Sequence, residues 1–211
     1  MNSINNLIKS SKIWYARQHQ IHQPKRTTGF ARLDHALMGG WPQSGLIELG
    51  YEGSGSGELA LVLPSLTQQT VAAEKMIFMV NPPFLLNPWQ LNEQGLNLNQ
   101  LYICNEPEHA LWLTEQALSH ALCEAVLLWH GHLNRQQCRR LKLASEKGNS
   151  RCFWLHDSQL DAKQKNSEAN VKLKLKLAPP HLLVTVTKIT GAMAGTSLQL
   201  DIFEQLAGHR R

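Results

Sequence analysis

The stretch LIELGYEGSGSGELALVLPSL, residues 46–66, joins an apolar run, a glycine-rich segment and a second apolar run. This order predicts a strand that enters a glycine-rich turn and then a helix, which is how a phosphate-binding loop is built. In such a loop lysine and then serine or threonine follow the last glycine, because a cation and a magnesium-binding hydroxyl face the triphosphate. Here Glu58 and Leu59 follow Gly57. The sequence therefore predicts the architecture of a phosphate loop without its two ligand side chains.

Short apolar runs alternate with helical segments on the C-terminal side of this loop. The expected strands are 75–80, 101–104, 125–129 and 151–156, and the expected helices are 59–73, 88–96, 108–123 and 134–147. A further short helix is expected around Asp34, before the loop, and it should stop at Gly39 and Gly40. Strands that alternate with helices in this way indicate a parallel sheet that is covered on both faces.

The pattern changes beyond Asp157. A polar segment, 158–170, is followed by VKLKLKLA at 171–178 and HLLVTVTKI at 181–189, both of which alternate strictly, and the last strand is expected within 196–203. Strict alternation indicates antiparallel strands with one wet face. The fold class is therefore α/β, with a three-layer α/β/α core, a mostly parallel central sheet and antiparallel C-terminal hairpins.

Length and composition bound the class of protein. The chain has 211 residues, of which 43% are hydrophobic and 18% charged, enough to bury the core of one domain. We expect a domain at 27–205, a basic N-terminal helix and linker at 1–26, and a basic C-terminal tail at 206–211. No apolar run of about 18 residues is present and the N-terminus does not resemble a signal peptide, so we expect no membrane span and a cytoplasmic location.

The cysteines and histidines do not predict a metal centre. Cys104, Cys123, Cys138 and Cys152 form no C-x-x-C pair, which favours buried reduced thiols over a zinc ribbon or a redox dithiol. The densest histidine group, His130-Gly-His132 with Cys138 downstream, matches no standard ligand spacing.

The segment TGFARLDHALMGGWPQSGLIELGYEGSGSGE, residues 28–58, resembles the entry segment of the RecA recombinase family. It resembles more closely the shortened relatives of that family, the ImuA proteins, which are accessory proteins of mutagenic translesion synthesis. The tail LKLAPPHLLVTVTKITGAMAGTSLQLDIF, residues 175–203, is similar to the closing hairpins of ImuA proteins. The segment 90–157 also resembles SulA, a cell-division inhibitor of the same superfamily, but SulA proteins lack much of the entry segment. The resemblance implies a RecA-like core over 27–203.

The resemblance also implies where the residues for ATP hydrolysis should stand. The loop lysine corresponds to Glu58, the magnesium-binding hydroxyl to Leu59, the catalytic glutamate to Pro83 and the aspartate after the fourth strand to Trp129. At about 4 Å and an effective dielectric near 20, one charge contact contributes about 4 kcal/mol, so replacing attraction by repulsion costs several kcal/mol of nucleotide affinity.

We therefore expect no catalytic residues, no cofactor and a degenerate loop. The glycines of that loop are Gly50, Gly53, Gly55 and Gly57. They would serve the backbone of the turn, with Glu52 and Glu58 capping the helix start. Weak phosphate binding by the backbone amides of the turn stays open as an alternative.

Two surfaces are candidates for binding a partner or DNA. The N-terminal segment combines cations with stackable rings in Lys12, Trp14, Tyr15 and Arg17, which suits a partner groove or single-stranded nucleic acid. The expected strand at 171–178 carries a second set, Lys172, Lys174 and Lys176, on one face. This lysine face would either protect a sheet edge or contact phosphates. Four tryptophans, Trp89, Trp112, Trp129 and Trp154, are expected mostly in core positions.

The resemblance to ImuA implies a non-catalytic accessory protein of the SOS DNA-damage response. Its expected partner is the Y-family polymerase-like protein ImuB, and RecA and a replicative-type polymerase are further candidates, with weak DNA binding. One alternative is a SulA-like inhibitor that binds the tubulin-like division protein. A second alternative is a weak DNA-dependent ATPase. The oligomeric state stays open.

Overall fold

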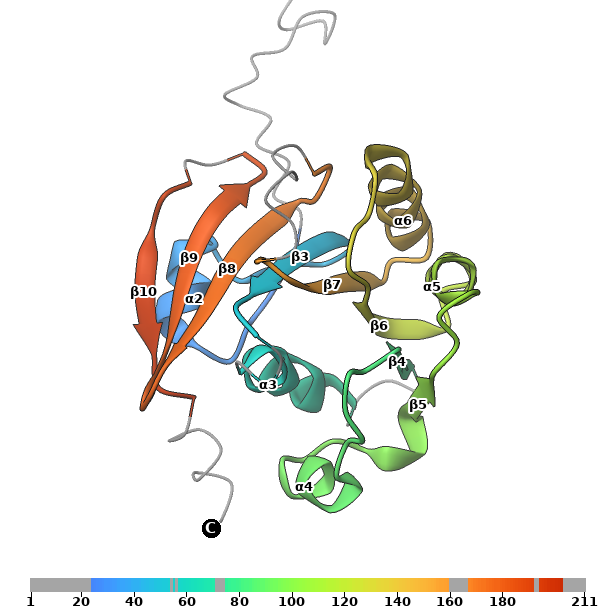
Figure 1. Ribbon diagram of the computed structural model, residues 1–211, viewed down its shortest axis with the longest axis horizontal. Helices are drawn as coiled ribbons and strands as arrows, with labels where there is room; N and C mark the ends of the chain where they lie inside the picture. Colours follow the sequence, from blue (N-terminus) through green and yellow to red (C-terminus); the bar gives the residue numbers. More distant parts are fainter. Residues whose placement is uncertain are drawn as a thin grey trace, which may run out of the picture.

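A single eight-stranded sheet forms the centre of the molecule (Figure 1). The computed structural model describes residues 24–53, 55, 57–70, 75–159, 167–191 and 194–202. The N-terminal candidates Lys12, Trp14, Tyr15 and Arg17, and the tail 206–211, lie outside the described residues.

The strands of the large sheet lie in the order β10-β9-β8-β3-β7-β6-β4-β5. Their bounds are β3 Gly45–Tyr51, β4 Met76–Val80, β5 Leu101–Cys104, β6 Cys123–Trp129, β7 Arg151–Asp157, β8 Val171–Ala178, β9 His181–Ile189 and β10 Ser197–Leu200. A small separate sheet pairs β1, Lys25–Arg26, with β2, Trp41–Pro42. The helices are α2 Ala31–Ala36, α3 Glu58–Thr70, α4 Pro88–Glu93, the 3₁₀ helix η1 Leu98–Gln100, α5 Ala110–Ser119 and α6 Arg135–Lys147.

The sheet is mostly parallel, as the alternation of strands and helices predicts. β3 pairs in parallel with β7 and β8, and β4 pairs in parallel with β5 and β6. The C-terminal strands β8, β9 and β10 pair antiparallel with one another. The predicted α/β class with antiparallel C-terminal hairpins is confirmed.

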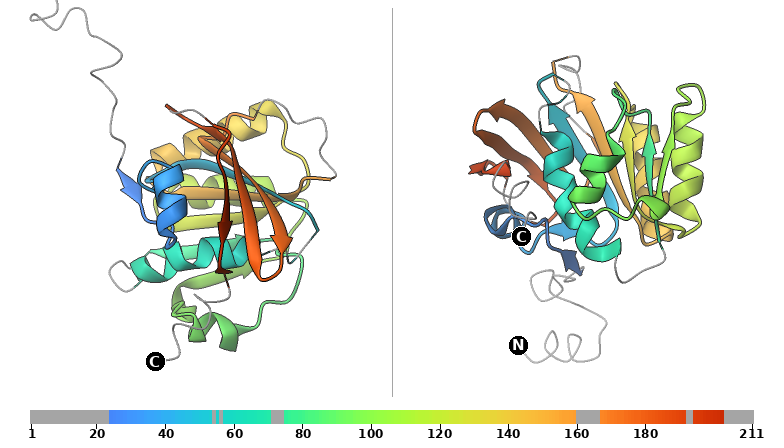
Figure 2. Two further views of the ribbon diagram at one scale, coloured as in Figure 1. Left: turned by 90° about the vertical axis from the view of Figure 1, so that its left-hand side faces the viewer. Right: turned by 90° about the horizontal axis from the view of Figure 1, so that it is seen from below.

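Helices cover both faces of the parallel part (Figure 2). On one face Ile47 and Leu49 of β3 pack with Leu61 and Leu66 of α3 in the larger core cluster. On the other face Leu46 belongs to a second cluster, with residues of α5 and α6 such as Leu118 and Leu141. Successive side chains of a strand point to opposite faces, so one buried strand supplies both cores.

The position of β8 corrects one expectation. β8 lies between β3 and β9, so it is an interior strand and its lysines cannot protect a sheet edge. The strict alternation of the segment is still explained, because Val171, Leu173 and Leu175 are buried on the core face.

Two helices are shorter than the sequence predicts. α5 ends at Ser119 instead of 123, because Ala121 adopts φ 57° and the chain then turns into β6 at Cys123. Leu122, within the range expected for that helix, is exposed. α4 ends at Glu93 and Gly95 follows with φ 85°, a conformation that glycine adopts without strain. The last strand, β10, is also shorter than expected.

The tryptophans and cysteines divide between core and surface. Trp129 and Trp154 are buried as expected, but Trp89 and Trp112 are exposed, so the prediction that most of these tryptophans lie in the core is only half correct. All four cysteines are free thiols, and three of them are buried. Burial raises the pKa of the Cys123 and Cys138 thiols to about 11.

In the described part of the chain, no helix combines the length and apolar character needed to cross a bilayer.

Phe153 tests the larger core. Its side chain is fully buried on β7, and its ring lies edge-on to Trp41 with the centroids 5.5 Å apart. We predict that Phe153→Ala lowers the free energy of unfolding by about 3–5 kcal/mol, because it removes apolar contacts and leaves a cavity. Urea denaturation measures this loss. Leu85→Ala is the control, since Leu85 is 99% exposed and its truncation should change stability by less than about 0.5 kcal/mol. Equal effects of the two substitutions would contradict the assignment of Phe153 to the core.

Candidate functional site

The strand, turn and helix predicted from residues 46–66 are present in the structure. β3 ends at Tyr51 and α3 begins at Glu58, and between them Gly53, Gly55 and Gly57 have φ values of 77°, 81° and 88°. Side chains with a Cβ rarely adopt these values, so the glycines permit the turn. Gly57 is also closely packed, because an added Cβ would lie 2.9 Å from Ile202 Cδ1.

Gly50 has a packing role of another kind. A Cβ at this position would lie 3.3 Å from His156 Cε1 and 3.3 Å from Ser158 Cβ. It therefore allows β3 to lie close to the side chains at the end of β7. The glycines of the loop are explained by backbone geometry and close packing without a ligand.

Glu58 is the first residue of α3, and its side chain contacts the turn. The residue is 4% exposed, and its Oε1 accepts a hydrogen bond from the Gly55 backbone N–H at 3.2 Å. An acid at the first position of α3 also interacts favourably with the helix dipole. Glu52, which we expected to cap the same helix, instead pairs with Lys176 (Oε2 to Nζ, 3.1 Å) on the neighbouring strand β8. Glu58 therefore lies at the helix start as expected, and the ion pair with Lys176 is an interaction of Glu52 that the sequence did not predict.

The four positions that correspond to hydrolytic residues meet in one pocket. Glu58, Leu59, Pro83 and Trp129 all line a cavity of about 180 Å³, together with Gly55, Gly57, Phe84 and Leu86. Their elements begin or end at the carboxyl edge of the parallel strands, after β3, after β4 and at the end of β6. Ligands of open α/β sheets bind at this edge, so the pocket lies where a nucleotide would be expected.

The chemistry of this pocket does not suit a triphosphate. Among the described residues that line it, none is a lysine, arginine, serine or threonine, and the one ionisable group is the Glu58 carboxylate. Leu59 and Pro83 present carbon atoms at the two positions that the resemblance assigns to a magnesium ligand and a water-orienting group. The backbone amide of Gly55 donates to Glu58 Oε1, so an internal carboxylate already holds this donor.

A second buried carboxylate, which the sequence analysis did not identify, lies on β3. Glu48 is fully buried, and Lys172 Nζ contacts its Oε1 at 2.6 Å. His156 Nε2 lies 3.2 Å from the same oxygen, and the Ser167 hydroxyl donates to Oε2. The His156 ring stacks on Trp154, with centroids 4.5 Å apart. We call Glu48, His156, Ser167 and Lys172 the Glu48 cluster.

The geometry of the Glu48 cluster indicates a structural role. The Ser167 hydroxyl donates to the carboxylate and not to the imidazole, so it is not arranged as a nucleophile activated by a histidine base. The cluster connects β3, β7 and β8 with Ser167, which lies within the polar segment 158–170. A signal was present in the sequence, since Glu48 interrupts a buried apolar run, but the sequence does not show which strands lie beside β3.

The lysines of β8 have different environments. Lys172 contacts Glu48, Lys176 contacts Glu52, and Lys174 is exposed between them. The three lysines share one face, as predicted, but only Lys174 and Lys176 present their side chains largely to solvent. Their role as a contact for DNA or a partner stays a prediction.

The Glu48 cluster makes stability depend on pH. Burial alone would raise the pKa of the Glu48 carboxyl, but hydrogen bonds from His156, Lys172 and Ser167, with the charge of Lys172, hold that pKa below its ordinary value. A carboxyl with a lowered folded-state pKa stabilises the fold above its unfolded pKa of about 4.3, and this contribution is lost as the pH falls through the folded pKa.

We predict that Glu48→Gln destabilises the fold by about 3 kcal/mol at pH 7, because the charge of Lys172 loses its buried partner. The difference from the wild type should shrink as the pH falls below about 4.3, because the unfolded chain then takes up a proton that the folded Glu48 carboxyl binds only at lower pH. Urea denaturation of the wild type and the variant, at pH 7 and at acid pH, measures both effects. Glu93→Gln, at an exposed position of α4, is the matched control. A Glu48→Gln deficit that stays constant with pH would contradict the assignment.

Comparison with known proteins gives a limited result. No protein-family model matches the chain, and no curated protein matches it significantly. Among solved structures, the crystal structure of SulA from Pseudomonas aeruginosa is similar at 21% sequence identity, with a TM-score of 0.44. The similarity covers 53% of this chain and 98% of that chain.

Proposed function

We propose that this chain is a non-catalytic RecA-like accessory protein of the SOS DNA-damage response, which supports error-prone translesion synthesis by binding a Y-family polymerase-like partner. The observation that carries the non-catalytic part is the position of Glu58. Its carboxylate, 4% exposed, stands at the start of α3 among the apolar side chains that replace the other hydrolytic groups.

Electrostatics explain why this arrangement disfavours catalysis of phosphoryl transfer. That reaction depends on cations and magnesium that neutralise the charge developing on the phosphoryl oxygens. A carboxylate in the same place repels those oxygens, and a pocket with apolar walls excludes the water that would screen the repulsion. Binding proteins through its surface is then the simplest activity that this scaffold retains.

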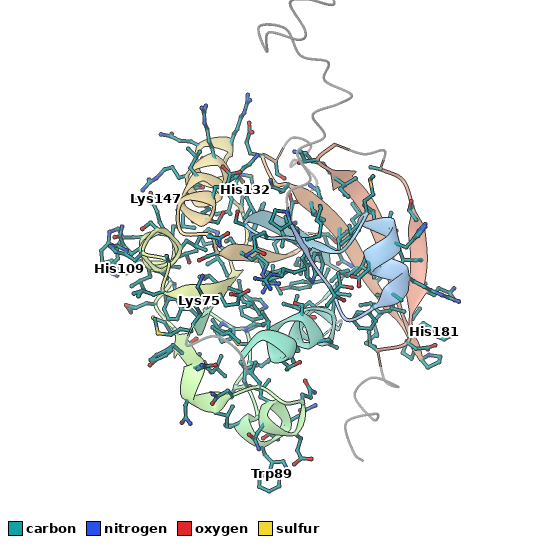
Figure 3. All side chains as sticks on the ribbon, turned by 180° about the vertical axis from the view of Figure 1, so that it is seen from behind. Lys75, Trp89, His109, His132, Lys147 and His181 are labelled. Atoms are coloured by element: carbon teal, nitrogen blue, oxygen red, sulfur yellow. The ribbon has the colours of Figure 1, made fainter. Side chains whose placement is uncertain are left out.

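Exposed apolar side chains support a protein-binding role. Phe84, Leu85 and Trp89 follow β4 in the chain, and all three are more than half exposed. Phe84 also lines the pocket of Glu58, and Trp89 points away from the body of the molecule (Figure 3). Large exposed apolar side chains close together in the chain are typical of interaction sites.

The assignment to translesion synthesis rests on the sequence resemblance of residues 28–58 and 175–203 to ImuA proteins. The alternative, inhibition of the tubulin-like division protein, rests on the resemblance of residues 90–157 to SulA proteins. RecA and a replicative-type polymerase remain candidate partners in the first case.

Affinity capture from DNA-damaged cells separates these functions. We predict that the tagged full chain recovers a Y-family polymerase-like protein, and that deletion of residues 1–23 abolishes the recovery. This deletion spares β1, whose Arg26 side chain donates to Gln43 Oε1 at 2.6 Å, so the small sheet is kept. Leu143→Ser on α6 is a control for loss of one exposed apolar side chain, and should still recover the polymerase.

Other outcomes would contradict the proposal. Recovery of the tubulin-like division protein, with filamentation of undamaged cells on overproduction, would favour the SulA-like alternative. Recovery of the polymerase by the variant lacking residues 1–23 would show that the basic N-terminal segment is not the docking element.

A further inference from the structure

We propose that the Glu58 pocket receives a lysine or arginine side chain of a protein partner. The pocket is the one lined by Gly55, Gly57, Glu58, Leu59, Pro83, Phe84, Leu86 and Trp129. This inference rests on the protein-binding function proposed above, and it names the chemistry by which one site would recognise its partner. In a catalytic relative this position would bind the negatively charged triphosphate, whereas the carboxylate of Glu58 favours a positively charged group.

The first observation is an unpaired buried oxygen. Glu58 Oε1 accepts from Gly55, but Oε2 is buried and no donor within the described part of the chain reaches it. Burying an ionised carboxylate is costly unless donors or a counter-charge satisfy it. An ammonium or guanidinium group that enters the pocket supplies both the donor and the charge.

The second observation lies on another element that lines the same pocket. Trp129 is 6% exposed at the end of β6, and its indole Nε1–H is buried and has no acceptor among the described residues. Indole N–H groups usually find an acceptor when they are buried. A partner chain would bring a backbone carbonyl beside its basic side chain, so one peptide can satisfy the carboxylate and the indole together.

The walls of the pocket suit the rest of such a side chain. Leu59, Pro83 and Leu86 offer apolar surface to the methylene stem, which lysine and arginine bury readily while their charged ends pair. At about 180 Å³ the cavity has room for one side chain. Phe84, which lines the pocket, and the adjoining Leu85 are exposed apolar residues, and contacts of this kind around an anchor exclude water in protein interfaces.

Two other occupants fit the lining less well. A divalent cation needs about six oxygen ligands, whereas the lining offers one carboxylate, and no group of three or more potential metal ligands occurs among the described residues. A phosphate would meet the Glu58 charge without a cation to balance it. Charge complementarity and the apolar walls together favour an organic cation.

The test is a heteronuclear NMR titration of the full, ¹⁵N-labelled chain. The probe is Nα-acetyl-lysine N-methylamide, and the norleucine analogue, which has a similar stem without the charge, is its control. We expect the lysine probe to shift the Trp129 indole signal and the Gly57 amide signal saturably. The norleucine analogue should bind about tenfold more weakly or worse, because it lacks the charge-assisted hydrogen bond. The Trp129 signal is assigned by its loss in Trp129→Phe.

Two variants with the same change of charge make the test specific. Glu58→Gln should weaken binding of the lysine probe by about tenfold, while the amide still accepts the Gly55 hydrogen bond and preserves the turn. Glu52→Gln is the matched control, because Glu52 lies in the same loop but pairs with Lys176 and does not line the pocket. The affinity of the Glu52→Gln variant for the lysine probe should equal that of the wild type.

The other outcomes are distinguishable. Equal binding of the two probes, or unchanged binding in Glu58→Gln, overturns the pocket assignment and leaves protein binding elsewhere on the chain intact. Saturable, magnesium-dependent shifts of the same signals by ATP would instead overturn the proposed non-catalytic function. If deletion of residues 1–23 alone shifts the Trp129 signal, the occupant is the chain's own basic segment and the assignment to a partner is wrong.

Discussion

The turn between β3 and α3 depends on the hydrogen bond from the Gly55 N–H to the Glu58 carboxylate, which places an anionic side chain of the protein itself at the turn. In a phosphate loop, backbone amides and the N-terminal end of the helix dipole converge on a bound phosphate. Here the carboxylate of Glu58, the first residue of α3, accepts one of these backbone hydrogen bonds in place of a phosphate oxygen. The glycine geometry of the turn is thus kept, while the described residues that line the pocket beside it carry no cationic or hydroxyl side chain.

The two buried carboxylates, Glu48 and Glu58, differ in how their charge is compensated. Glu48, inside β3, has three partners and joins the parallel strands to the antiparallel hairpins through Lys172. Glu58, after β3, has one oxygen that accepts from Gly55 and one that no donor among the described residues reaches. A buried charge that is fully paired holds elements together, whereas one that is partly paired is a place where a ligand of opposite charge gains affinity.

Much of the fold could be predicted from the sequence because its signals are local. The apolar run AVLLW marks a buried strand, and the glycines at 53, 55 and 57 mark a turn with positive φ. The end of α5 could not be predicted. The chain turns at Ala121, which adopts the left-handed conformation, and the sequence has no glycine there to indicate a turn. The neighbours of β8 depend on sheet order, which is set by long-range packing, so Lys172 could not be assigned to Glu48.

The candidate site divides in the same way. The resemblance to the recombinase family implied that Glu58, Leu59, Pro83 and Trp129 stand at hydrolytic positions, and the structure brings all four to one pocket. That no described residue reaches Glu58 Oε2 or the Trp129 indole could not be predicted, because it depends on side-chain placement across three segments. The exposure of Trp89 and Trp112 also runs against the expectation that most of these tryptophans are buried.

The most direct test of the central claim is steady-state phosphate release from ATP by the purified full chain, with magnesium and with single-stranded DNA present. We predict release no faster than in a protein-free control, because the carboxylate of Glu58 stands where a cation would have to stabilise the transferring phosphoryl group. Sustained, DNA-stimulated release that is proportional to protein concentration would show that this site is still catalytic and would contradict the account.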